Sequence, residues 1–178
     1  MTQIIIKETG IKIGNILIEF PTSVESLVSA LGLSRPDTIS TPVYHMLLWN
    51  SEGIYAYQNK KTKSIDCIGF QFHRSSESDI NTRPTGFFRG SIILNNTIID
   101  TFFSKQKCIE NSFSSDFEKE WNFSISNLST FIEVDQETDK VTEVEVRITS
   151  DEKIKMSLLS RLRLKWIIFK RILRASGV

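Results

Sequence analysis

The chain has 178 residues and a mass of 20.4 kDa, which fits one domain or two small halves packed as one unit. Apolar residues make up 40% and charged residues 24%, a balance that excludes a fully disordered chain. Its 22 basic and 21 acidic residues give a net charge of +1, so the overall charge excludes a strongly basic nucleic-acid-binding protein. No apolar run is long enough to span a membrane and the N-terminus lacks a signal-peptide core, so we expect a cytoplasmic protein.

The first third of the chain predicts strands around one short helix. Twenty-four isoleucines against three alanines favour strands throughout. Residues 3–7 and 11–20 are Ile-rich runs on either side of a turn, and Gly14 is expected to form a bulge within the second run. The apolar spacing of residues 24–31 predicts a helix that is capped by Ser23 and stops at Gly32.

The rest of the chain predicts two groups of three strands. Residues 43–49, 54–58 and 65–72 are apolar runs separated by tight polar turns, which is typical of an antiparallel meander. A long polar loop over 74–86 follows. The second group is preceded by a strand over 88–94 and a short helix over 98–107, and its strands are expected over 121–125, 130–134 and 141–148.

This order of elements occurs twice, over residues 11–73 and 88–148. Val144 and Val146 follow Ile68 and Phe70 by the same number of residues, and Gly90 follows Gly14 by that number too. Trp121 follows Trp49 by slightly fewer residues. A tandem duplication explains these matches, and chance similarity between β-rich sequences is the alternative. We therefore predict an α+β fold with two antiparallel meanders and two short helices in a β-rich domain over residues 1–150.

Charge is distributed unevenly in the last third of the chain. Residues 109–152 carry 12 acidic and three basic side chains, whereas residues 153–178 carry eight basic side chains and none that is acidic. Residues 154–175 have helical apolar spacing, so we predict a long basic amphipathic helix within residues 151–178. Three roles stay open for it: packing on the sheet, completing an interface with a partner, or lying in the plane of a membrane.

The motifs of the common enzyme classes do not occur in the sequence. There is no phosphate-binding loop, dinucleotide fingerprint, nucleophile elbow or HExxH motif. Two cysteines, Cys67 and Cys108, and two histidines, His45 and His73, leave little scope for a metal centre, so we expect no metal and no cofactor. We predict a protein that is not an enzyme, with no small-molecule substrate and no nucleic-acid partner.

Two segments carry a family resemblance. Leu48-Trp49-Asn50-Ser51-Glu52-Gly53-Ile54 and Phe88-Arg89-Gly90-Ser91-Ile92-Ile93-Leu94 resemble patterns of small bacterial immunity proteins, which accompany polymorphic toxins of the Rhs or type VI secretion kind. Asn50 stands where that pattern has an aspartate. The helix followed by a Trp-bearing meander also looks like the architecture of β-lactamase-inhibitor proteins, at the level of fold only.

The resemblance implies that the chain neutralises a cognate toxin domain by direct, stoichiometric binding. The long loop over 74–86 is a second candidate contact region. The alternatives are a peripheral membrane or scaffold protein that uses the C-terminal basic helix, and a hydrolase that reverses the toxin's modification. An acidic face would suit a basic toxin, and the candidate contact residues are Asp116, Glu118, Glu120, Glu133, Asp135, Glu137 and Asp139.

Overall fold

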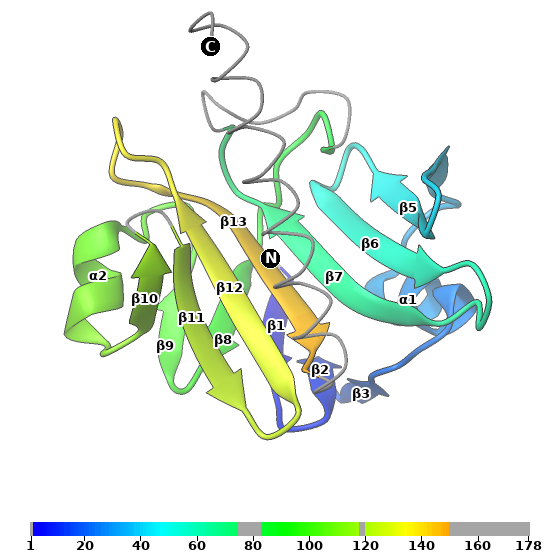
Figure 1. Cartoon of the computed structure of the whole chain (residues 1–178), viewed down its shortest axis with the longest axis horizontal. Coiled ribbons are helices and arrows are strands. Elements are labelled where there is room, and N and C mark those ends of the chain that lie inside the picture. The colour runs from blue at the N-terminus through cyan, green and yellow to red at the C-terminus, as the bar shows by residue number, and fades with distance from the viewer. Residues whose placement is uncertain (1, 75–82, 118–119, 150–178) are drawn as a thin grey trace, which may run out of the picture. The chain divides into compact units, whose positions relative to one another are not determined.

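The computed structural model describes residues 2–74, 83–117 and 120–149, which fall almost entirely within the unit formed by residues 1–148 (Figure 1). These residues form 13 strands in two sheets, with two small helices. The predicted α+β class is therefore wrong, because the molecule is mostly β: helix α1 (Val24–Leu31) has eight residues and helix α2 (Lys105–Glu110) has six. The long helix predicted within residues 151–178 lies outside the described residues.

Helix α1 begins and ends where the sequence predicts. The Ser23 hydroxyl accepts a hydrogen bond from the Ser26 N–H at 3.1 Å, which caps the first turn. Gly32 ends the helix in the left-handed region, at φ +63°, and its N–H binds the Val28 carbonyl. Leu27 on this helix is fully buried in the main core. Neither helix of the described residues has the length and apolarity that a membrane crossing requires.

The five-stranded sheet is made of short strands from two distant parts of the sequence. Its central strand β1 (Gln3–Ile6) is antiparallel to β2 (Gly10–Ile13) and parallel to β8 (Ser91–Leu94). Strands β3 (Ile16–Glu19) and β9 (Thr97–Ile99) form the two edges.

Two turns of this sheet differ from the sequence prediction. Gly14 has φ +57° in the tight turn between β2 and β3, so residues 11–20 form two strands and not one bulged strand. Asn95 and Asn96 also have positive φ, at +47° and +65°, and turn β8 back into β9. Residues 97–99 are therefore a strand, and the helix predicted from residue 98 begins at Lys105.

The eight-stranded sheet is antiparallel throughout and joins two four-stranded meanders into one surface (Figure 1). The first meander is β4 (Asp37–Ser40), β5 (Tyr44–Trp49), β6 (Ile54–Asn59) and β7 (Ile65–Gln71). The second is β10 (Ser114–Phe117), β11 (Glu120–Ile125), β12 (Leu128–Val134) and β13 (Val141–Ile148). The last strands of the two meanders, β7 and β13, pair with each other at the centre of the sheet.

The pairing of β7 with β13 relates the two halves by a local two-fold axis. Gly69 lies opposite Glu145, and the interval between these two positions equals the constant offset of the sequence matches. Strand β5 precedes β11 by the same interval. Trp49 and Trp121 do not occupy equivalent positions in the two halves, because Trp49 ends β5 and Trp121 is the second residue of β11. Each half thus contains a hairpin, a short helix and a meander, and the duplication itself stays a prediction.

One main core fills the space between the sheets. Alternation along each strand sends every second side chain of the eight-stranded sheet toward the five-stranded sheet. Ile4 and Ile92 from the smaller sheet and Trp49, Phe70 and Val144 from the larger one belong to a single cluster of buried side chains. The other face of the eight-stranded sheet, which we call the outer face, therefore carries the intervening residues.

Candidate functional site

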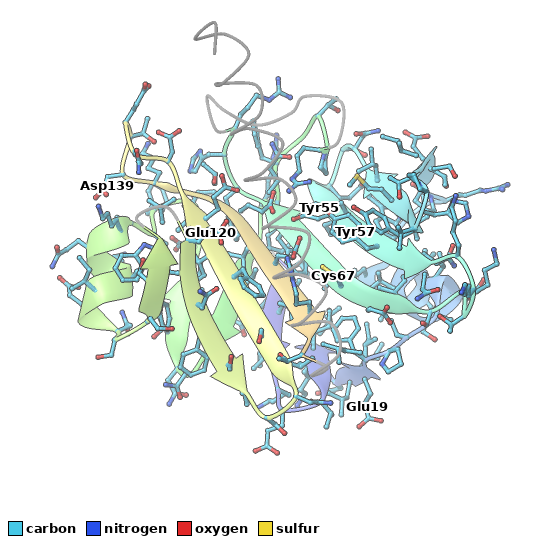
Figure 2. All side chains as sticks on the ribbon, in the orientation of Figure 1. Glu19, Tyr55, Tyr57, Cys67, Glu120 and Asp139 are labelled. Atoms are coloured by element: carbon cyan, nitrogen blue, oxygen red, sulfur yellow. The ribbon has the colours of Figure 1, made fainter. Side chains whose placement is uncertain are left out.

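The outer face has an apolar half on the first meander. Met46, Leu48 and Tyr55 form a second buried cluster, separate from the main core, against which Ile39 and Tyr57 pack. These residues alternate with core residues along their strands. The Tyr57 ring meets the Tyr55 ring edge to face, at a centroid distance of 5.6 Å. Figure 2 labels Tyr55 and Tyr57 on β6.

Tyr55 is the link between this apolar half and the carboxylates of β13. It is fully buried, and its ring lies across Gly69 on the neighbouring strand. A Cβ on Gly69 would come within 1.9 Å of the Tyr55 Cζ atom, so the glycine is required for space. The Tyr55 hydroxyl donates to Glu143 and lies 3.1 Å from Glu145 Oε2.

Arg83 forms a planar, forked contact with Glu143 on this face. Its Nε lies 2.5 Å from Glu143 Oε2, and its Nη2 lies 3.2 Å from Glu143 Oε1. Its Nη1 donates to the Tyr57 hydroxyl at 3.3 Å, and its Cζ stands 4.7 Å from the centre of the Tyr55 ring. Arg83 therefore uses a carboxylate, a phenol and an aromatic face together.

Arg147 repeats part of this arrangement one step along the strand. Its guanidinium forms an ion pair with Glu145 and lies 4.2 Å from the centre of the Phe131 ring. Phe131 and Glu145 are directly opposite each other on β12 and β13. The outer face therefore contains two sets of a carboxylate, an aromatic ring and a guanidinium.

Burial and charge change the acidities of this network. Burial raises the pKa of the Tyr55 phenol well above its ordinary value, and the Glu143 charge raises it further. Burial also raises the pKa of Tyr57 to about 12, although the Arg83 charge opposes the change. Burial lowers the pKa of Arg83, but its interactions with Tyr55 and Glu143 outweigh that effect and leave the pKa raised. Both phenols therefore stay protonated and the guanidinium stays charged at neutral pH.

A row of acceptors crosses four neighbouring strands of the outer face. Glu120 on β11 lies opposite Glu133 on β12, Glu133 lies opposite Glu143 on β13, and Glu143 lies opposite Gln71 on β7. Side chains that are directly opposite project from the same face, and adjacent strands are about 4.8 Å apart. We call Gln71, Glu143, Glu133 and Glu120 the acceptor row.

The structure brings only two of the predicted contact residues into this row. These two residues are Glu120 and Glu133, and both are partly exposed. Figure 2 labels Glu120. Asp116 lies on the edge strand β10, and Glu118 lies outside the described residues. Glu137 and Asp139 are exposed in the turn between β12 and β13.

Asp135 begins that turn and organises it. It is buried, and its Oδ1 accepts hydrogen bonds from the Glu137 N–H at 3.1 Å and from the Thr138 N–H at 2.9 Å. The Thr138 hydroxyl donates to the same oxygen at 3.0 Å. The contacts of Asp135 therefore hold the turn together.

The sequence analysis singled out neither Glu143, Glu145 nor Tyr55, and it included Arg83 only as part of the candidate contact loop over residues 74–86. One signal was present: Glu143, Glu145 and Arg147 alternate with buried valines in β13, so they had to share the face away from the core. Their convergence with Tyr55 depends on the pairing of β7 with β13, which joins the two halves of the chain.

The carboxylates at the centre of the outer face are paired with guanidinium groups of the protein itself. The described residues contain no group of three side chains that could hold a metal ion. Glu143 and Glu145 each pair with a guanidinium, and their carboxylates can accept hydrogen bonds from further cationic donors.

The Cys108 thiol is buried, and its burial together with the Asp139 charge raises its pKa to about 12.

One comparison with known proteins identifies a family. The model of the family described as "Domain of unknown function (DUF7738)" matches residues 3–108, more than half of the chain, and the protein belongs to this family. The matched segment runs from β1 into α2 and includes the whole first meander. No curated protein and no solved structure gives a significant match.

Proposed function

We propose that this protein neutralises a bacterial toxin domain by direct, stoichiometric binding through the outer face of its eight-stranded sheet. The observation that carries the proposal is the acceptor row, in which Glu120, Glu133 and Glu143 stand side by side on adjacent strands. A row of acidic side chains on one face of a sheet is complementary in charge to a basic protein surface, and such a surface is what a basic toxin domain would present.

The neighbouring apolar half supports the same function. Tyrosine, methionine and arginine are enriched in protein interfaces. Tyr44, Met46 and Tyr57 lie on strands of the same sheet as the carboxylates, and the Arg83 side chain links Tyr57 to Glu143. An acidic row beside aromatic groups suits a basic toxin domain, such as a nuclease. In line with the resemblance to immunity proteins of Rhs and type VI toxins, we propose that it acts in the cytoplasm of the producing cell, without a cofactor and without catalysis.

The resemblance implies that the toxin gene lies beside the immunity gene, so the test is a growth assay in which a toxin domain from an adjacent gene is expressed with and without this protein. We expect the wild-type chain to restore growth, and the Glu120→Lys/Glu133→Lys variant to lose that protection. Glu19→Lys is a single-site control for charge reversal away from the row, because Glu19 is an exposed carboxylate on β3 of the other sheet (Figure 2). It should protect as well as the wild type.

Titration of the purified toxin domain separates binding from catalysis. Inhibition by binding should be complete at one inhibitor per toxin, and the charge-reversed variant should bind at least about tenfold more weakly. Full inhibition at a small fraction of that ratio would point to an enzyme that reverses the toxin's modification. Unchanged protection by the charge-reversed variant would remove the acceptor row from the interface.

A further inference from the structure

Three of the four sheet edges in the described part of the chain are protected against pairing with another strand. Three of the four residues of β4 are exposed and polar, and one of them is the charged Asp37. Strand β10 has a register shift between Ser115 and Phe117, and β9 is only three residues long. Polar and charged side chains, bulges and short length are the usual means by which proteins prevent unwanted strand pairing.

The fourth edge, strand β3, is apolar and regular. Among the described residues it pairs with β2 alone, without a register shift, at the margin of the five-stranded sheet (Figure 1). Its Ile16 and Leu17 side chains are 51% and 48% exposed. Its one charged residue, Glu19, ends the strand and accepts a hydrogen bond from the Thr9 hydroxyl at 3.1 Å. An exposed apolar edge of this kind is a template for a further strand.

The backbone of β3 presents hydrogen-bonding groups to this open side. The Phe20 N–H donates to the Thr9 carbonyl at 2.9 Å, which continues the pairing of β3 with β2. The residues that bond to a neighbouring antiparallel strand alternate along the chain, so Ile18 also bonds to β2. The N–H and C=O groups of Leu17 and Glu19 therefore point away from β2, toward the open side.

We propose that β3 pairs with β3 of a second copy of this chain, antiparallel and about a two-fold axis at Leu17. In this register Leu17 lies opposite Leu17 of the second copy, and Ile16 lies opposite Ile18. Both exposed apolar side chains thus gain apolar neighbours across the new pair of strands. Glu19 lies opposite Asn15, which is exposed and uncharged, so no like charges meet.

A second copy fits this edge better than a strand of unrelated sequence, because β3 is its own complement in this register. A two-fold axis makes every contact reciprocal, so the outward backbone groups of Leu17 bond to the same groups of the second copy. Since the other edges of the described residues are protected, the pairing uses the available edge and stops at two copies. Two four-residue strands bury less surface than a permanent dimer interface does, so we expect a reversible dimer.

The test is analytical ultracentrifugation of the full chain from about 5 to about 500 µM, where a weak pair of this size should form. We expect the mass to rise from that of one copy toward that of two. Leu17→Lys places two like charges at the centre of the pair and should raise the dissociation constant at least about tenfold. Ile98→Lys is the matched control, because Ile98 is 54% exposed on β9 at the other edge of the same sheet. It should associate as the wild type does.

Hydrogen exchange locates the contact within the chain. The amide protons of Leu17 and Glu19 should exchange more slowly at the high concentration than at the low one, because both bond across the new pair. Circular dichroism checks that Leu17→Lys is folded, and Leu17→Thr replaces it if it is not.

Four outcomes would overturn the proposal: a single-copy mass at every concentration, assemblies of more than two copies, dimers of Leu17→Lys as stable as those of the wild type, or protection of the Leu17 amide only when a toxin domain is added. The last would assign this edge to a strand of the toxin. Growth protection by Leu17→Lys is measured separately and should be unchanged, since β3 is not part of the eight-stranded sheet.

Discussion

Tyr55 and Gly69 lie opposite each other on β6 and β7, and the Tyr55 ring fills the space that a side chain on Gly69 would take. Gly69 is also the residue opposite Glu145 at the centre of the sheet. The missing side chain therefore lets one tyrosine cross a whole strand and place its hydroxyl between Glu143 and Glu145. This relationship connects the two meanders on the outer face.

The first prediction concerns Gly69→Ala. Its Cβ would meet the Tyr55 ring at 1.9 Å, so the ring must move and give up its hydrogen bonds to the two glutamates. Overpacking and lost buried hydrogen bonds should together lower the free energy of unfolding by about 2–4 kcal/mol. Urea unfolding measures this loss.

Tyr55→Ala provides the matched background for that experiment. With the ring removed, Gly69→Ala should cost less than about 1 kcal/mol, because the clash is gone and alanine fits a strand at least as well as glycine. An equal cost in both backgrounds would show that the ring is not what requires glycine at this position.

The second prediction concerns the pair of Arg83 and Glu143. Arg83→Met leaves a carboxylate that is only 12% exposed without its cation, and the arginine side chain itself is only 24% exposed. We expect a loss of about 2–4 kcal/mol in the free energy of unfolding, somewhat below that of a fully buried pair. The Arg83→Met/Glu143→Gln double variant should be more stable than the sum of the single changes implies, and a double-mutant cycle that shows additivity would contradict this.

The third prediction is a loss of stability at alkaline pH. The pKa of Tyr57 is about 12 in the folded protein, against about 10 for an unfolded tyrosine, so its contribution is complete below pH 10. Above about pH 10 the unfolded state loses its proton first, and stability should fall by about 1.4 kcal/mol per pH unit until about pH 12. Tyr55, whose pKa is also raised, steepens the fall.

Tyr57→Phe checks that assignment, because it removes the titrating group and keeps the ring. Denaturant unfolding from pH 9 to 12 should show a shallower fall for this variant than for the wild type, and absorbance of tyrosinate should lose its component near pH 12. Identical slopes for the two proteins would assign the alkaline transition to another group.

Local signals in the sequence predicted the strands that have clear alternation and clear turns. Leu47 and Trp49 point into the main core and Met46 and Leu48 away from it, within the run predicted as a strand over 43–49. The bounds of helix α1 were also predicted correctly, because Ser23 and Gly32 cap it. The predicted class was wrong because α1 and α2 are the only α-helices of the described residues, and both are short.

The candidate site was harder to predict, because it depends on contacts that no local pattern encodes. Glu120 and Glu133 were predicted as contact residues because acidic residues are dense in this part of the sequence. The same reasoning selected Asp135, whose carboxylate organises a turn. Arg83 lies within the polar loop predicted over residues 74–86, and only the fold brings it to Glu143, 60 residues away. Long-range strand pairing therefore determines which charges meet.

The turn between β8 and β9, which leads into a strand where the sequence predicts a helix, gives the last prediction. Asn95 and Asn96 are exposed and have positive φ, a conformation that asparagine tolerates and glycine adopts without a steric cost. Asn96→Gly should therefore keep the hairpin and change the melting temperature little, with a stability change of about 0.5 kcal/mol or less. Asn96→Val places a β-branched residue at φ +65° and should cost about 1–2 kcal/mol. Thermal unfolding of the two variants measures the difference, and a valine variant as stable as the glycine one would mean that this turn does not need the left-handed conformation.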